Sequence, residues 1–208
     1  GGSGSMEGQL SGIAKRRLPQ QTMFTGETAP VPTVIAAEQE LLYHNGIGGF
    51  RLDGKEYCIR LERDNTPAPW INVIANANFG FIVSESGSGY TWCENSHAFR
   101  LTPWSNDAIS DPPGEVIYLC DQATGRIFTP TALPVRDDGI YDVRHGFGYS
   151  VFEHSCLGIS QTLTQFVPVK DAVKISLLVL KNETDVLRRL SATYYVRPVL
   201  GVTDQTTA

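Results

Sequence analysis

The sequence predicts an all-β protein folded as an antiparallel β-sandwich. Three observations support this fold class: short runs of alternating apolar and polar residues recur after residue 45, turn residues separate them, and helical periodicity is almost absent. Regular short strands joined by tight turns are typical of two packed antiparallel sheets. With 208 residues, 41% of them hydrophobic, the chain is long enough to bury a sizeable core.

The chain divides into four segments of different character. Residues 1–6, "GGSGSM", resemble a cloning scar or linker, and residues 7–44 form a leader arm. Within this arm the stretch "PTVIAAEQELLYHNG" predicts a short helix that ends at its Asn-Gly pair. Residues 45–202 form the predicted β-sandwich domain, and residues 203–208 form a tail.

Turn motifs predict three hairpins. Asp53 and Gly54 lie between two extended runs, which is a strong short-range hairpin signal. The turn "DQATG" joins "EVIYLC" to "RIFT", and "KNETD" separates the last two alternating runs. We therefore expect those last two runs to pair with each other.

The first of the two runs that "KNETD" separates alternates with a period of two. Lys174 and Ser176 point to one face, and the apolar side chains point to the other. The apolar set is Val173, Ile175, Leu177 and Val179. In the second run the apolar-face set is Leu190, Ala192, Tyr194 and Val196, opposite Arg189, Ser191 and Thr193.

The stretch "TPAPWINVIANANFGFIVSESGSGYTW", residues 66–92, is rich in aromatic residues and contains Glu85 as its only ionisable acid or base. Pro67 and Pro69 favour an extended approach to Trp70, which we predict to fill the core. Trp92, at the end of the stretch, is consistent with either a core position or a binding surface.

Residues 95–114 show neither helical nor strand periodicity, and long structureless loops of this kind are often functional. Three prolines, Pro103, Pro112 and Pro113, stiffen the loop. Aromatic rings stack on the apolar faces of sugars, and Asp, Asn and Arg bind their hydroxyls. The predicted saccharide-binding residues are Trp92, Asn95, Arg100, Trp104, Asn106 and Asp107. The alternative interpretation makes Arg100 and Asp107 a structural ion pair.

Several function classes are disfavoured. A net charge of −5 argues against a nucleic-acid partner. Asp107 could form an acid pair with Asp111 or Glu115, but this spacing is also that of solvated turn acids, so we expect no catalytic residue. The sequence has no G-x-S-x-G nucleophile elbow and no phosphate-binding glycine loop that opens a helix.

We also expect no metal site and no cofactor. His145 and His154, with Glu153, would face opposite sides of one extended strand, which favours structural histidines. The four cysteines are widely spaced and no signal-peptide pattern opens the chain, so reduced thiols are expected.

Five motifs carry a resemblance to a known family: "NGIGGF…DGKEY", the whole 66–92 stretch, "NSHAFRLTPWSNDAISDPPGEVIYLCDQATG", "RHGFGYSVFEH" and "LTQFVPVKDAVKISLLVLKN". The region from residue 45 to about residue 202 resembles the phosphorylase-type region of cyclic β-1,2-glucan synthases. It is also similar to the N-terminal β-sandwich of glycoside hydrolase family 94, formerly glycosyltransferase family 36.

The resemblance implies a supersandwich, galactose-mutarotase-like fold that packs on a helical α/α-barrel. In the family that barrel carries the catalytic aspartate, so no residue here inherits it. The implied partners are a β-glucan oligosaccharide, the barrel of the parent chain and a second copy of this chain. The implied location is the cytoplasmic side of a bacterial inner membrane, as a soluble part of a larger membrane protein.

Three functions are open at this point. The first is a carbohydrate-binding and scaffolding domain of a β-glucan phosphorylase or synthase, which is not catalytic alone. The second is an interaction module that docks the catalytic domain and dimerises without binding sugar. The third is a complete small glycoside-active enzyme.

Overall fold

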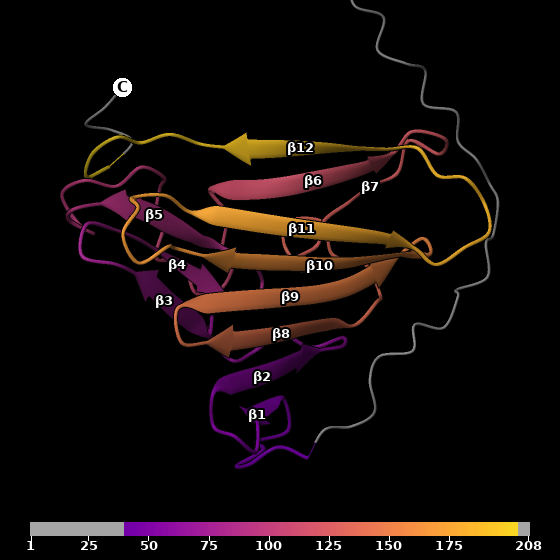
Figure 1. Ribbon diagram of the computed structural model, residues 1–208, viewed down its shortest axis with the longest axis horizontal. Coiled ribbons are helices and arrows are strands. Elements are labelled where there is room, and N and C mark those ends of the chain that lie inside the picture. Colours follow the sequence, from indigo (N-terminus) through magenta and orange to yellow (C-terminus); the bar gives the residue numbers. More distant parts are fainter. Residues whose placement is uncertain (1–39, 204–208) are drawn as a thin grey trace, which may run out of the picture.

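The computed structural model describes residues 40–203, which form twelve β-strands and no helix (Figure 1). In chain order the strands are β1 (Gly48–Phe50), β2 (Glu56–Leu61), β3 (Ile71–Ala75), β4 (Phe79–Ser84), β5 (Gly89–Cys93), β6 (Glu115–Asp121), β7 (Ile127–Phe128), β8 (Tyr141–Gly146), β9 (Tyr149–Cys156), β10 (Ile159–Phe166), β11 (Ile175–Asn182) and β12 (Leu190–Val196). Every strand pairing is antiparallel, which confirms the predicted all-β fold class. Residues 40–203 contain no helix with the length and hydropathy of a membrane span.

Three sheets bury one common core. The large sheet has the order β1-β2-β8-β9-β10-β11, and the small sheets have the orders β3-β4-β5 and β12-β6-β7. In Figure 1, β8 to β11 lie side by side across the middle of the view, and β12 and β6 run along its upper edge. Phe152 of the large sheet packs in the same core as Phe81 of β4, and Ile117 of β6 packs against them. Each fully buried ring of this kind contributes roughly 2–3 kcal/mol.

The first two predicted hairpins are confirmed. β1 pairs with β2 from Gly48 opposite Ile59 to Phe50 opposite Tyr57. Gly54 in the connecting turn has a φ of +67°, a conformation that glycine adopts without strain. β6 pairs with β7 across the "DQATG" turn in the same way.

The third predicted hairpin is wrong. β11 pairs with β10 in the large sheet, whereas β12 pairs with β6 in a small sheet. The connection between them is held by side chains: Asn182 donates to the Val186 carbonyl at 2.8 Å, and Arg188 forms an ion pair with Asp121 at the end of β6. These contacts direct the chain out of one sheet and into the other.

The alternation along β11 is present, but its apolar face is the outer one. Leu177 and Val179 are 56% and 53% exposed, whereas Leu178 packs against the core. Lys174 lies on the face opposite the apolar set, as the alternation predicts, and this face is the inner one. Its ammonium group lies 2.8 Å from the Glu115 carboxylate and 4.4 Å from the centroid of the Phe81 ring. A buried charged partner therefore outweighs the hydrophobic pattern of the strand.

Trp70 packs against the core as predicted. Its backbone N–H donates to the Glu85 carboxylate at 2.7 Å, and the Thr66 hydroxyl donates to the same carboxylate. Burial raises the pKa of Glu85, and the Thr66 hydrogen bond opposes that rise. Glu85, the one ionisable acid in the aromatic stretch, thus fastens both the start of that stretch and Trp70.

The predicted leader helix falls mostly on residues 1–39, which lie outside the described residues. Its last part, residues 40–44, is not helical. Leu42 instead forms an antiparallel bridge with Phe50, with backbone hydrogen bonds of 2.8 and 2.9 Å in the two directions. This pairing adds the end of the leader to the β1 edge of the large sheet.

Candidate functional site

The loop of residues 95–114, between β5 and β6, is anchored to the sheet at both ends. Near its start, Leu101 N–H donates to the Thr91 carbonyl at 2.8 Å, and the Thr102 hydroxyl accepts from Thr91 N–H at 2.8 Å. Near its end, Asp111 accepts hydrogen bonds of 2.6 Å each from Ser84 at the end of β4 and from Ser86 in the β4–β5 turn. The loop is therefore a fixed part of the β3-β4-β5 sheet, as its prolines led us to expect.

Three of the predicted sugar-binding residues converge on Tyr90 of β5. The rings of Trp92 and Trp104 lie 5.4 and 5.3 Å from the Tyr90 ring, and the Arg100 guanidinium lies 5.3 Å from it. Trp92 is 9% exposed and Tyr90 is 8% exposed, whereas Trp104 is half-buried. Trp92 is thus mainly a core side chain, and Trp104 with Arg100 forms the accessible part of what we call the Tyr90 cluster, made of Tyr90, Trp92, Arg100 and Trp104.

Tyr90 itself was absent from the sequence-based set. Its signal is the spacing in "GYTW": residues two apart on a strand share a face, so Tyr90 belongs with Trp92. The alternative ion pair between Arg100 and Asp107 does not form within the described part of the chain. Arg100 instead donates to the carbonyl oxygens of Ser96 and Val202, both at 3.3 Å.

Asn95, Asn106 and Asp107 lie in turns of the loop. The Asn95 carboxamide oxygen accepts hydrogen bonds from two backbone N–H groups, at 2.9 and 2.7 Å. The Asp107 carboxylate accepts from two backbone N–H groups, at 2.9 and 3.1 Å, and from the Ser110 hydroxyl at 2.5 Å. The Ser110 hydrogen bond lowers the pKa of Asp107. Asn106 is exposed with a φ of +51°, which Asn tolerates better than most residues. No hydrogen bond or ring contact in residues 40–203 joins these three to the Tyr90 cluster.

The acids considered for a catalytic pair are bound to separate groups. Asp111 is held by serine hydroxyls, and Asp107 caps its own turn. The Glu115 side chain is 10% exposed and forms an ion pair with Lys174. Thr91, Thr102 and Tyr194 also donate to its carboxylate, at 2.5, 2.8 and 2.7 Å. Burial alone would raise the pKa of Glu115, but Lys174 and these hydroxyls lower it to about 2.

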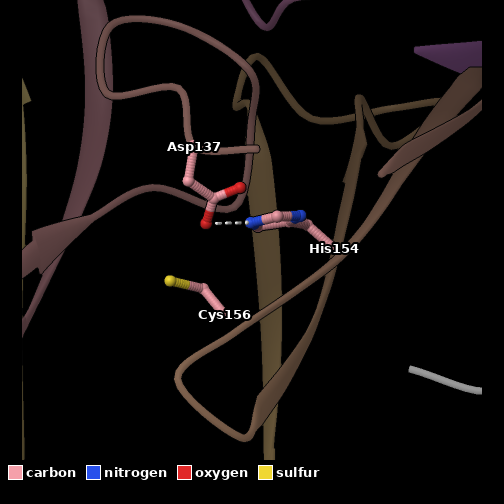
Figure 2. Close-up of side chains that lie close together, drawn as sticks. All are labelled: Asp137, His154 and Cys156. Carbon is pink, nitrogen blue, oxygen red and sulfur yellow. Dashed lines mark hydrogen bonds and ion pairs between the residues drawn. The ribbon is translucent and has the colours of Figure 1, made fainter. Parts of the chain in front are cut away.

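A second group of reactive side chains lies where the segment after β7 meets β9. Asp137, His154 and Cys156 place one carboxylate oxygen, one ring nitrogen and one sulfur within 4.8 Å of one another (Figure 2). His154 Nε2 lies 3.1 Å from Asp137 Oδ2, and Nδ1 lies 2.9 Å from the Ile140 carbonyl. We call these three residues the Asp137 cluster.

The Asp137 cluster is electrostatically coupled. Burial raises the pKa of Asp137, but hydrogen bonds from His154 and Cys156 outweigh it and hold that pKa well below its ordinary value. Burial raises the pKa of the Cys156 thiol to about 12, and the Asp137 carboxylate adds to this shift. The Cys156 thiol is therefore protonated at neutral pH.

The sequence analysis placed His145 and His154 on one extended strand, and that placement is wrong. His145 and His154 lie on neighbouring strands, β8 and β9, because the chain reverses between Gly146 and Tyr149. His145 is a structural residue that bonds to Ser150 at 2.8 Å and to the Trp70 carbonyl at 3.1 Å, and burial lowers its pKa to about 4. His154 and Cys156, two residues apart on β9, share a face, which is the spacing that could have pointed to the cluster.

The fold is an antiparallel β-sandwich with an anchored aromatic loop between β5 and β6. The chain belongs to the family described as glycosyl hydrolase 94, supersandwich domain, which it matches over residues 55–208. This finding confirms the resemblance in the sequence and the supersandwich type of the fold.

Several curated proteins are similar to this chain. The cyclic beta-(1,2)-glucan synthase NdvB of Rhizobium meliloti (strain 1021) is 40% identical over 168 residues, which cover 78% of this chain and 6% of that protein. The N,N'-diacetylchitobiose phosphorylase of Vibrio furnissii is 35% identical over 152 residues, which cover 72% of this chain and 19% of the phosphorylase. A 3-O-beta-D-glucopyranosyl-beta-D-glucuronide phosphorylase of Paenibacillus borealis is 28% identical over 136 residues, 65% of this chain and 16% of that protein. The chain thus spans less than a fifth of the length of each of these relatives.

Proposed function

We propose that this domain is the glucan-facing scaffold of a β-glucan phosphorylase or cyclic β-1,2-glucan synthase. The observation that carries the proposal is the Tyr90 cluster: an anchored loop holds a half-buried Trp104 ring and the Arg100 guanidinium together over one buried ring. A ring of this kind stacks on the apolar face of a glucose unit, and a guanidinium donates to its hydroxyls.

In this proposal the domain binds glucan but does not cleave it. Its partners are a β-glucan oligosaccharide and an adjoining helical α/α-barrel that carries the catalytic acid. The assembly belongs to a larger membrane protein, with this region on the cytoplasmic side of the inner membrane. Asn95, Asn106 and Asp107 are proposed to contact the same glucan from the loop turns, beside Trp92, Arg100 and Trp104.

Calorimetric titration of the 208-residue chain with linear β-1,2-glucooligosaccharides tests this proposal. We expect saturable binding that weakens about tenfold in Trp104→Ala, because a stacked ring contributes on the order of 1 kcal/mol. Phe147→Ala is the matched control, because Phe147 is an exposed aromatic in the β8–β9 turn of the large sheet. Equal affinity in Trp104→Ala and the parent chain, or no binding by the parent chain, would contradict the proposal.

A second candidate function is an interaction module that does not bind sugar. It is favoured by apolar side chains on the outermost strands of two sheets, β11 and β12. The exposed set, each between 37% and 56% accessible, is Leu177, Val179, Leu180, Tyr194, Tyr195 and Val196. Edge strands with exposed apolar side chains favour association.

Light scattering coupled to size exclusion distinguishes this candidate. As an interaction module, the chain forms concentration-dependent dimers, and Val179→Lys on the β11 edge converts them to monomers. Ile127→Lys, at an exposed position on β7, is the control. A monomer at all concentrations, together with glucan binding, favours the scaffold.

A further inference from the structure

The Asp137 cluster takes no part in the proposed glucan function, and it combines the three side-chain types that bind transition metals. Carboxylate, imidazole and thiolate together are typical of zinc and related ions, whereas calcium and magnesium prefer oxygen ligands alone. In tetrahedral zinc sites with bonds of about 2.0–2.3 Å, ligand atoms lie roughly 3.3–3.7 Å apart. Two ligand atoms of the cluster lie 3.1 Å apart and the third is within 4.8 Å of both, so the three are close to the spacing that one ion requires.

The surroundings of His154 orient it as metal-bound histidines are oriented. Its Nδ1–H donates to the Ile140 carbonyl at 2.9 Å, which directs Nε2 towards Asp137 and Cys156. Its ring stacks on Tyr141 at 3.8 Å with an interplanar angle of 11°. The His154 side chain is fully buried, so both contacts fix its position.

Asp137 is oriented by the backbone and remains reachable from solvent. The Gly139 N–H donates to Asp137 Oδ1 at 2.7 Å, which leaves Oδ2 facing the histidine. A Cβ at position 139 would lie 2.7 Å from His154 Cε1 and 2.8 Å from Asp137 Oδ1, so the close approach requires glycine. The Asp137 side chain is 29% exposed, which provides a path for an ion.

A separate observation concerns the residue that faces His154 across the sheet. Gln161 on β10 is 1% exposed, and neither its amide nitrogen nor its amide oxygen has a hydrogen-bond partner. It pairs directly with His154 in the β9–β10 register, so both side chains point to the same face of the sheet. A buried amide without a partner is costly, and a ligand or water bound to a metal ion in the cluster supplies one.

We propose that Asp137 Oδ2, His154 Nε2 and Cys156 Sγ bind one divalent ion of the zinc class. Binding displaces two protons to solvent, one from the thiol and one held between Nε2 and the carboxylate. The fourth position takes a water molecule that Gln161 hydrogen-bonds. The site fastens the segment between β7 and β8 to β9, and it shares no residue with the Tyr90 cluster.

Cobalt(II) titration of the 208-residue chain under anaerobic conditions tests the proposal, because cobalt in a tetrahedral thiolate site gives intense visible bands and a near-ultraviolet sulfur-to-metal charge-transfer band. We expect one equivalent to produce both signals and one equivalent of zinc to abolish them. Cys156→Ser should lose the charge-transfer band, and Cys120→Ser, the control at another half-buried cysteine, should retain it. Absence of the bands in the parent chain, or their survival in Cys156→Ser, would overturn the site.

A second measurement needs no variant. The alkylation rate of each cysteine is followed by peptide mass spectrometry with and without zinc. We expect zinc to slow alkylation of Cys156 at least tenfold and to leave the other three cysteines unchanged, all four being free thiols of intermediate exposure. Protection of none of them, or equal protection of all four, would rule out the proposed ligand set.

Discussion

Glu115 and Asp137 are two acids that the fold surrounds with polar partners, but the partners differ in kind. Glu115 receives one ammonium group and three hydroxyls, and all four donate to its carboxylate. Asp137 instead shares its carboxylate with an imidazole and a thiol, which are themselves metal ligands. The two acids therefore offer a comparison between a closed network and an open cluster.

The comparison shows how a structural acid differs from a candidate site in the same sandwich. Around Glu115 every partner is satisfied by the carboxylate, and the network joins β5, β6, β12 and the segment before β11. Around Asp137 a neighbouring amide, Gln161, is left without a partner, and the acid itself is partly accessible. Completed hydrogen bonding indicates stability, whereas incomplete hydrogen bonding among ligand-type groups indicates binding.

Removing the Glu115 charge should have the largest effect. Glu115→Gln leaves the Lys174 ammonium buried without a counter-ion, and we expect a loss of roughly 3–5 kcal/mol in the free energy of unfolding. Urea unfolding measures it. Glu183→Gln is the control, because Glu183 pairs with Lys181 at an exposed position and should cause no measurable change. A loss in Glu115→Gln no greater than in the control would show that the network is not structural.

Acid should reproduce part of this loss. The folded-state pKa of Glu115 is about 2, below the ordinary value of 4.5, so the unfolded chain binds a proton more readily between these values. The stabilisation, roughly 3 kcal/mol, is full above about pH 4.5 and is lost as the pH falls towards 2. The difference in unfolding free energy between the parent chain and Glu115→Gln should shrink over this window, and a constant difference would contradict the assignment.

Removing one hydroxyl from the network should have a smaller effect. Tyr194→Phe deletes the 2.7 Å hydrogen bond to Glu115 while keeping the ring, and a hydrogen bond to a charged group contributes about 1.5 kcal/mol. Tyr195→Phe, at the next position on β12, serves as the control and should change the unfolding free energy by less than about 0.5 kcal/mol. Equal effects of the two substitutions would remove Tyr194 from the network.

The smallest effect on the metal-free chain should come from Cys156→Ser. Serine is close to cysteine in size and keeps a donor beside Asp137, so we expect a change of less than about 1 kcal/mol in the unfolding free energy. The same substitution should abolish the zinc-dependent rise in melting temperature that we expect of the parent chain. Differential scanning fluorimetry with and without zinc measures both. A zinc response that persists in Cys156→Ser would place the ion elsewhere.

Sequence reasoning succeeded where neighbours along the chain decide the outcome. The Asp53-Gly54 turn, the "DQATG" turn and the core position of Trp70 depend on local geometry and on a short apolar run, and each was confirmed. It failed at the "KNETD" turn, because the choice between a hairpin and a crossover depends on Arg188 meeting Asp121, 67 residues away.

The candidate sites also differ in whether neighbours along the chain or distant residues bring their side chains together. Trp92, Arg100 and Trp104 lie within a short stretch of sequence, and the structure brings them together around Tyr90, although it buries Trp92. Asp137 was missed because the path of the chain after β7 had to be known before it could be placed beside His154. Cys156 was missed although it lies two residues from His154 on the same strand.

The sequence by itself determined the all-β class, most strand positions and the family, since these follow from periodicity, turn chemistry and motifs that nearby residues carry. Only the tertiary structure decided which strands pair and which polar groups meet. Glu115 lies 59 residues from Lys174 and 79 from Tyr194, and Asp137 lies 17 from His154. Contacts at such separations depend on how whole sheets pack, because burial of a charge is tolerated only where the folded chain supplies its partner.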